Sequence, residues 1–318
     1  MILRCREFFS PDIYTSSAGD IKMRGVFVEF IASIIVSGIS LGGQYALIAI
    51  GYTMVYGILR LINFAHGDVF MVAGMVLIYM VASLPWYIAI PIAIAFTIIL
   101  GFIIERAAYM PLRNAPRMSV MISAIGVSYL LQNFMTYITA GQPMYYPTIP
   151  FLSGTVNILN TPTKWAKIVT PVIVIVLVFA LTQLINHTKI GMAMRAVSKD
   201  FETSRLMGIK INKVISVTFI IGSALAAVGS VLYFTNFSVI VPTSGALPGL
   251  RAFVAAVFGG IGSVPGAVVG AFVIGICESI IRGTDFATFS DAFTFALLII
   301  ILVVKPTGLF GEKTTDKV

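Results

Sequence analysis

Residues 60–70 read "RLINFAHGDVF", which places four polar or ionisable side chains between two long apolar stretches. A metal site would need several His, Cys or carboxylate ligands at suitable spacing. Here only His66 and Asp68 lie close together, and the other histidine is the distant His187. No Ser or Cys in the setting of an activated nucleophile accompanies them. We therefore expect no metal site and no catalytic residues. Asn63, His66 and Asp68 are interpreted as a helix junction, either purely structural or part of the gate of a path.

A second unusual stretch, residues 258–270, reads "FGGIGSVPGAVVG". It is a poor phosphate-binding loop, because no GK[ST] follows it and no strand precedes it. Glycines in a membrane helix permit close contact between backbones, and they can also form a hinge that moves. Both readings stay open for the gating candidates Gly259, Gly260, Gly262 and Pro265.

The longest charged stretch covers residues 195–213, "RAVSKDFETSRLMGIKINK". Val197, Phe201 and Arg205 recur at four-residue spacing, which predicts a short amphipathic helix. Acidic residues near its start suit the positive end of the helix dipole, and Gly208 is placed to end it. Its apolar face requires either the lipid interface or the groove of a partner protein.

Further polar residues occur inside apolar runs. Glu278 lies four residues before Arg282, and we interpret the two as an i,i+4 pair at the rim of a span. Five others either line a path or bond a neighbouring helix: Gln44, Tyr45, Tyr52, Gln132 and Asn133.

Composition identifies the environment of these residues. Of the 318 residues, 58% are hydrophobic and 11% charged, and the mean hydropathy is +0.99. A soluble domain carries about 25% charged residues and about 45–50% apolar ones. So few charges cannot cover a core of this size with a wetted surface, so the surface must face lipid. The chain is predicted to be an integral membrane protein.

The charge and the cysteines fit this class. A net charge of +8 would suggest nucleic acid in a soluble protein. Membrane proteins, however, concentrate Lys and Arg in cytoplasmic loops, so we expect no nucleic-acid partner. Cys5 and Cys277 show no CxxC spacing, so neither a disulfide framework nor a zinc site is indicated.

The apolar runs are about 18–25 residues long, which is the length of a membrane-spanning helix, and they lack the period-two alternation of barrel strands. We expect an all-α fold of about ten crossings, near 26–48, 50–63, 69–84, 86–105, 118–140, 168–187, 214–236, 248–261, 264–282 and 288–304. Several are short enough to be broken helices. Gly-interrupted stretches at 57–75 and 249–270 suggest two pseudo-related halves around a path.

Basic residues fix the predicted orientation. They gather around 105–117, in 188–213 and after residue 304, so these segments are expected in the cytoplasm. The turn-rich loop 141–167 is expected outside. The predicted organisation is a cytoplasmic tail 1–25, a transmembrane domain 26–304 and a cytoplasmic tail 305–318, with both termini cytoplasmic.

Four long motifs point to a family. "LGGQYALIAIGYTMVYGILRLINFAHGD", "RLMGIKINKVISVTFIIGSALAAVGSVL", "VFGGIGSVPGAVVGAFVIGICES" and "KPTGLFG" resemble, in the same order, the LivH-type permease subunits of branched-chain amino acid ABC importers. The likeness runs from about residue 33 to about residue 311. In "NFAHGD", Asp68 stands where the family often has Glu.

The resemblance implies a type II importer fold in the bacterial inner membrane. It also implies a LivM-like second permease, two cytoplasmic ATPase subunits and an extracytoplasmic amino-acid-binding protein, which would dock over 141–167 and the 236–248 turn. The chain has no Walker A sequence, so ATP and Mg²⁺ would be bound by the ATPase partners, with no cofactor in this chain.

The charged helix then resembles the coupling loop of importer permeases, with the spacing of Glu202 and Gly208 kept. This favours a groove on the ATPase. The coupling residues implied are Arg195, Asp200, Glu202, Arg205 and Gly208.

Two other classes compete with this reading. A stand-alone secondary transporter or channel would need charged residues deep in the bilayer for ion coupling, and a membrane enzyme would need a catalytic constellation. Co-purification with an ATPase would separate the importer from the stand-alone transporter. The solute class is expected to be branched-chain or other amino acids, amides or urea.

Overall fold

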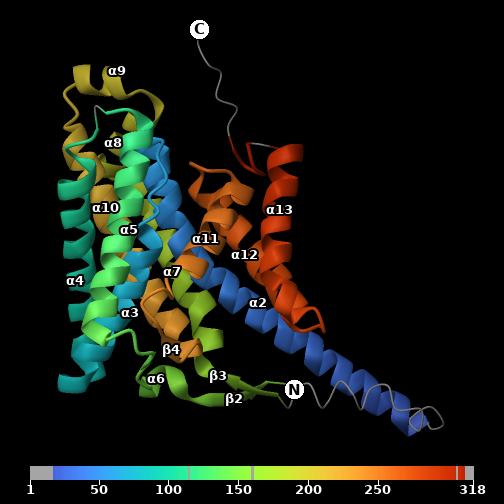
Figure 1. Ribbon diagram of the computed structural model, residues 1–318. Helices are drawn as coiled ribbons and strands as arrows, with labels where there is room; N and C mark the ends of the chain where they lie inside the picture. Colours follow the sequence, from blue (N-terminus) through green and yellow to red (C-terminus); the bar gives the residue numbers. More distant parts are fainter. Residues whose placement is uncertain (1–16, 114, 159–160, 306, 312–318) are drawn as a thin grey trace.

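The computed structural model describes residues 17–113, 115–158, 161–305 and 307–311, and these form a helical bundle (Figure 1). Within the described residues, eight helices are long and apolar enough to span a membrane, and one apolar helix is shorter. The nine helices are α2 (Ser17–Leu59), α3 (His66–Ser83), α4 (Trp86–Ile104), α5 (Arg117–Thr139), α7 (Trp165–His187), α10 (Ile211–Asn236), α11 (Ala246–Gly259), α12 (Val264–Arg282) and α13 (Ser290–Val304). A π-helical turn, η3 (Glu105–Tyr109), extends α4, and a short 3-10 turn, η4 (Ala287–Phe289), precedes α13. The predicted class, an all-α integral membrane protein, is confirmed.

Two of the predicted crossings are not separate spans. The expected spans 26–48 and 50–63 are one continuous helix, α2. Its glycines pack against neighbours and do not interrupt it. A methyl group on Gly42, for example, would lie 2.7 Å from the Cα atom of Phe272 on α12. Gly42 therefore allows the backbones of α2 and α12 to come into close contact.

The single α2 also changes the position of the N-terminal segment. The beginning of α2 lies at one end of the bundle and the end of α13 at the other (Figure 1). Residues 17–25, expected in an N-terminal tail, are part of α2. The expectation that both termini lie in the cytoplasm stays a prediction. Residues 1–16 and 312–318 lie outside the described residues.

Helices α2, α3 and α10 form the buried centre of the bundle, and α5, α7 and α13 are exposed over most of their length. The centre is packed with aromatic and aliphatic side chains, such as Phe70, Phe234 and Leu47. The exposed helices carry apolar side chains outward, as expected for surfaces that face lipid or another membrane subunit.

One end of the bundle is closed by short strands. Strand β1 (Met144–Tyr145) pairs antiparallel with β4 (Val239–Ile240). A hairpin of β2 (Thr155–Ile158) and β3 (Thr161–Lys164) follows the short helix α6 (Pro150–Ser153). The loop 141–167 and the 236–248 turn, expected to receive the same partner, are therefore joined.

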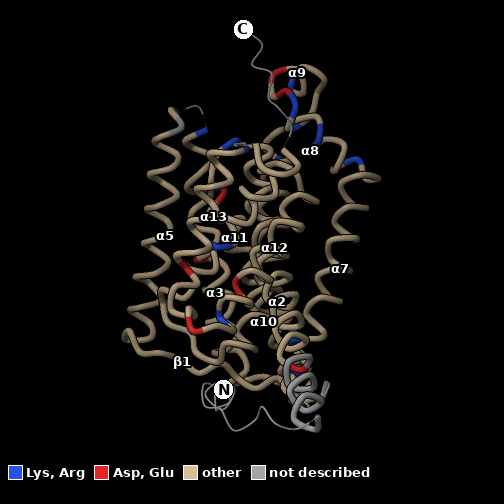
Figure 2. Tube along the Cα trace, turned by 90° about the vertical axis from the view of Figure 1, so that its right-hand side faces the viewer, with Lys and Arg blue, Asp and Glu red and all other residues tan. Residues whose placement is uncertain are grey.

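The opposite end carries α8 (Lys189–Lys199) and α9 (Phe201–Leu206), which protrude from the bundle (Figure 1). Lys and Arg residues gather along the chain at this end (Figure 2). The two ends of the bundle therefore differ in charge as well as in structure.

Candidate functional site

Helix α3 begins inside the bundle and not at its edge. The imidazole of His66, its first residue, packs directly on Gly51 of α2. Gly51 precedes the end of α2 at Leu59 by eight residues, which is about 12 Å along a helix. After α2, residues 60–65 therefore return into the bundle before α3 starts. The predicted junction at "NFAHGD" is a re-entrant break.

The beginning of α11 meets the beginning of α3 at this depth. A methyl group on Gly67 would lie 2.6 Å from the backbone oxygen of Gly245 and 3.1 Å from the Cα atom of Gly249. Only glycines allow the two backbones to approach so closely. Neither helix has a side-chain cap at its first turn. We call this meeting of α3 and α11 the junction.

A cavity of about 350 Å³ opens beside the junction. This volume is in the range of about 300–1,000 Å³ that is typical of ligand sites. Its walls come from α2, α3, α5 and α11 and are mostly apolar or aromatic; they include Tyr52, Phe64, Ile125, Tyr129, Leu250 and Phe253. Asp68, Ser128 and Gln132 supply its polar side.

Asp68 is 2% exposed and connects α3 to α5. The Ser128 hydroxyl donates to its Oδ2 atom at 2.5 Å, and the Gln132 amide donates to its Oδ1 atom at 2.9 Å. As an acidic residue in the first turn of α3, it also faces the positive end of that helix dipole. The two side chains that donate hydrogen bonds to the Asp68 carboxylate are therefore both neutral.

A second polar cluster fixes α11 to its neighbours. The Arg251 guanidinium on α11 lies 3.1 Å from Glu278 of α12 and pairs with Asp291 of α13. The Tyr45 hydroxyl of α2 donates to Glu278 at 2.9 Å and accepts from Arg251 at 3.0 Å. Arg282 pairs with Glu278 at 2.6 Å, as predicted. The expected position at a rim was wrong for Glu278, which is fully buried because two other helices also supply partners, through Tyr45 of α2 and Arg251 of α11.

The protruding end is built around a capped helix. The carboxylate of Asp200 accepts the backbone N–H groups of Glu202 and Thr203, each at 3.0 Å, which starts α9. Gly208 follows with a φ of 80°, the left-handed conformation that favours glycine after a helix. Between them Leu206 is 87% exposed and Met207 is 79% exposed. We call α8, α9 and the turn to Gly208 the protrusion.

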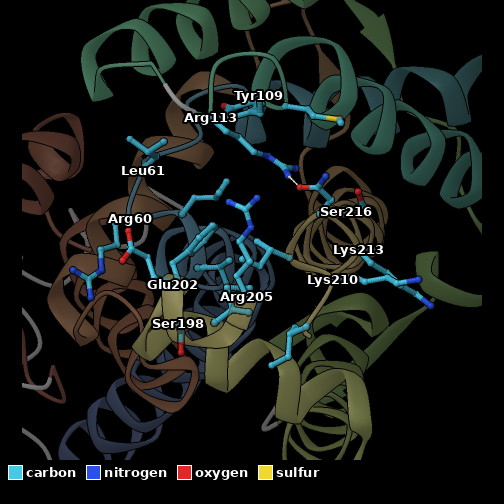
Figure 3. A pocket seen from close by; sticks show the side chains of 18 of the residues that line it. Arg60, Leu61, Tyr109, Arg113, Ser198, Glu202, Arg205, Lys210, Lys213 and Ser216 are labelled. Atoms are coloured by element: carbon cyan, nitrogen blue, oxygen red, sulfur yellow. Dashed lines mark hydrogen bonds between the residues drawn. The ribbon is translucent and has the colours of Figure 1, made fainter. Parts of the chain in front are cut away.

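A larger cavity of about 1440 Å³ lies between the protrusion and the bundle (Figure 3). Glu202 and Arg205 of α9 line it on one side, and Arg113, which bonds Asn212 at 2.5 Å, lines it on the other. Burial lowers the pKa of the Arg113 guanidinium, while the adjacent Glu105 raises it. An Arg pKa starts so high that this group stays charged.

Comparison with known proteins gives the family. Residues 34–302 match the family described as "Branched-chain amino acid transport system / permease component". The chain belongs to this family. The resemblance inferred from the four motifs is confirmed, and the chain is a multi-pass membrane permease.

Individual relatives cover nearly the whole chain. The permease is 39% identical over 299 residues to the high-affinity branched-chain amino acid transport system permease protein LivH of Escherichia coli, covering 89% of this chain and 96% of the relative. It is 38% identical over 297 residues to BraD of Pseudomonas aeruginosa, covering 89% and 97%. Among solved structures, PsaBC of Streptococcus pneumoniae in complex with Fab is similar at 12% identity and a TM-score of 0.42, covering 87% and 91%.

The predicted path-lining residues lie in different surroundings in the structure. Tyr52 and Gln132 line the cavity at the junction. Gln44 is buried and donates to a backbone oxygen of α10, and Tyr45 belongs to the Arg251 cluster. Asn133 is exposed on α5 and bonds its own helix. Sequence alone could not distinguish Gln44, Tyr45 and Asn133 from residues that line a path. A path lining and a bond between or within helices both need polar groups inside a span.

The predicted gating residues also fall into two groups. His66 and Asp68 lie at the junction, and Asn63 accepts a hydrogen bond from Tyr109 at 2.7 Å. Gly259, Gly260, Gly262 and Pro265 form the turn from α11 to α12, away from the junction. Gly260 and Gly262 have φ of 110° and 99°, and Gly259 and Gly260 touch other backbones closely. These contacts favour the close-packing reading of this stretch.

The predicted coupling residues are distributed over two helices, not one. The expected amphipathic helix is divided at Asp200, because this residue caps α9 and ends α8. Arg195 on α8 donates to Asn186 at 2.8 Å and so faces α7. Sequence reasoning did not place Leu206 and Met207 among the contact residues, although two large apolar side chains before a glycine were a usable signal. It also missed Arg251, Gly67 and Gly245.

Proposed function

We propose that this permease is one half of the membrane pathway of an ATP-driven importer of branched-chain or related amino acids. The observation that carries the proposal is the combination of a cavity at a break between two helices with a protrusion that holds apolar side chains away from the bundle. The cavity provides a route for the solute, and the protrusion provides a surface for a separate ATPase subunit. The names of the relatives support the choice of solute.

The route passes the junction. Non-helical backbone at membrane depth is tolerated where it is surrounded by protein or lines a cavity, and transporters place solute sites at such breaks. The apolar walls from Phe64, Leu250 and Phe253 suit an aliphatic side chain. The exposed face of α5, with Tyr129 and Asn133, is available to a second permease subunit, which would complete the path.

The ATPase subunit would bind the protrusion. Leu206 and Met207 are exposed at the basic end of the bundle, which the positive-inside rule places in the cytoplasm. An ATPase subunit that covers these side chains would bury apolar area that α9 cannot bury alone. ATP and Mg²⁺ would be bound by this partner. The opposite end, with the β1–β4 ribbon, would face the extracytoplasmic binding protein.

The test is a reconstituted complex with both permeases, the ATPases and the binding protein. Gly208→Ala forces a side chain into the left-handed conformation, and Glu202→Ala removes the acidic group of α9. Both variants should insert normally and hydrolyse ATP, while leucine uptake per ATP falls at least fivefold. Val176→Ala is the control, because this side chain is exposed in the middle of α7, on a face to which no partner is assigned. Undiminished uptake by both variants would refute the coupling role.

A further inference from the structure

Three acidic residues are fully buried in the described part of the chain, and two of them are neutralised by arginine. Glu105 pairs with Arg113, and Glu278 pairs with Arg251 and Arg282. Asp68 is the third. Among the described residues no Lys or Arg contacts it, and the side chains that donate hydrogen bonds to it are Ser128 and Gln132, both neutral. Asp68 therefore differs from the other two in its charge balance.

The location of Asp68 is also different. It lines the cavity at the junction, whereas Glu278 is enclosed by protein and Glu105 is sealed by Arg113 and Ser216. A carboxylate buried in a span without a cation is expensive and marks a functional position. Each of its oxygens accepts one protein hydrogen bond and retains a further lone pair. A cation that enters the cavity can therefore bind without displacing Ser128 or Gln132.

The other walls of the cavity also suit a cation, in particular an ammonium group. Tyr52, Phe64 and Phe253 place aromatic rings on its walls, and aromatic faces attract ammonium groups as well as apolar chains. A solute with one ammonium group and an aliphatic side chain matches both sides of the cavity. An amide or urea has no ammonium group and would leave the carboxylate without a counter-charge.

We propose that Asp68 binds the α-ammonium group of the amino acid during its passage, and so selects amino acids over uncharged solutes inside the membrane. This inference rests on the proposed transport function. It assigns Asp68 a direct contact with solute, and Ser128 and Gln132 the task of holding the carboxylate in place.

The alternative is that Asp68 only fastens α5 to α3 through these two hydrogen bonds. The two roles predict different mutational patterns. Asp68→Asn keeps the shape of the side chain and removes the charge, whereas Ser128→Ala removes a fastening bond and keeps the charge. Gln132→Lys leaves Asp68 intact but adds a resident ammonium group beside it, which would compete with the solute.

The experiment measures [14C]leucine uptake and ATP hydrolysis by the whole complex in proteoliposomes. Asp68→Asn and Gln132→Lys should lower uptake per ATP at least tenfold, with ATPase stimulation by the loaded binding protein kept within twofold. Asp68→Glu should restore uptake to within threefold of the wild type. Ser128→Ala and Gln132→Leu each remove one hydrogen bond to the carboxylate but keep its charge, so uptake should fall less in either of them than in Asp68→Asn.

Other results would overturn the inference or the proposed function. Uptake by Asp68→Asn within twofold of the wild type would overturn the inference, and so would an equal loss in Ser128→Ala, since fastening would then explain both. If Asp68→Asn does not assemble, equal uptake by Gln132→Lys and Gln132→Leu would overturn it. A wild-type complex that shows no ATP-driven leucine uptake would instead refute the proposed function.

Discussion

The junction and the protrusion are built in opposite ways. At the junction, glycine backbones of α3 and α11 touch, and the Arg251 cluster holds α11 to three other helices. At the protrusion, α9 has six residues, one cap and two apolar side chains that stand clear of the bundle. The first region is stabilised by contacts within the chain, whereas the second is the surface that we propose for another protein. The contrast teaches that stability and partner binding can be assigned to different regions of one permease.

The largest effect on stability is expected at the Arg251 cluster. Arg251→Met leaves Glu278 buried beside only Arg282 and Tyr45. Removing one partner of a buried ion pair costs about 3–5 kcal/mol. Denaturation by SDS in mixed micelles measures the free energy of unfolding. Arg282→Met is the control and should cost less, because the Arg282 side chain is 33% exposed and Glu278 keeps Arg251. Equal losses would contradict the central position of Arg251.

A smaller loss is expected from overpacking at the junction. Gly67→Ala places a methyl group against the backbone of Gly245, where no flexible side chain can move away. Overpacking of this kind costs about 1–3 kcal/mol. The same denaturation measurement applies, with Gly126→Ala as the matched control. If the two alanine variants were equally stable, the two helices would not meet as closely as described.

The cap of α9 should have a smaller and local effect. Asp200→Ala removes the acceptor for two backbone N–H groups, which costs about 0.5–2 kcal/mol of helix stability. Hydrogen exchange of α9 should become faster, whereas the exchange of α2 and α10 stays unchanged. Faster exchange in the central helices would show that the protrusion supports the bundle.

The smallest effect on the isolated permease is expected from its exposed apolar side chains. Leu206→Asp and Met207→Asp together should change the free energy of unfolding by no more than about 0.5 kcal/mol, as for other surface positions. Capture of the ATPase partner should nevertheless weaken at least tenfold in a co-purification titration. Phe151→Asp, at the opposite end of the bundle, should not alter capture. Unchanged capture by the double variant would remove the basis of the coupling proposal.

Much of the fold could be predicted from sequence, because apolar runs of membrane-spanning length are strong signals. The ends of α3, α7, α12 and α13 were expected within a few residues. The continuous α2 was not, since a glycine beside the expected break, Gly51, fits either a break or a close contact, and only its neighbour decides which. The same ambiguity affected Gly259 and Gly260.

The sites were predicted in part. The pattern of "NFAHGD" indicated a break, and Asp200 and Gly208 indicated the limits of a helix, because these signals are local. Arg251 was missed and Glu278 was placed at a rim, because their pairing depends on residues 27 positions apart that meet only after α11 and α12 pack. The cavity at the junction depends on four helices and has no local signal.

Accumulation of leucine against a gradient tests the central claim most directly. Proteoliposomes with both permeases and with leucine-loaded binding protein outside are compared with and without the ATPase subunits, each with ATP enclosed in the lumen. The account predicts accumulation only when the ATPase is present, and its loss when Leu206 and Met207 are replaced by Asp. Accumulation by the permeases without any ATPase would contradict it.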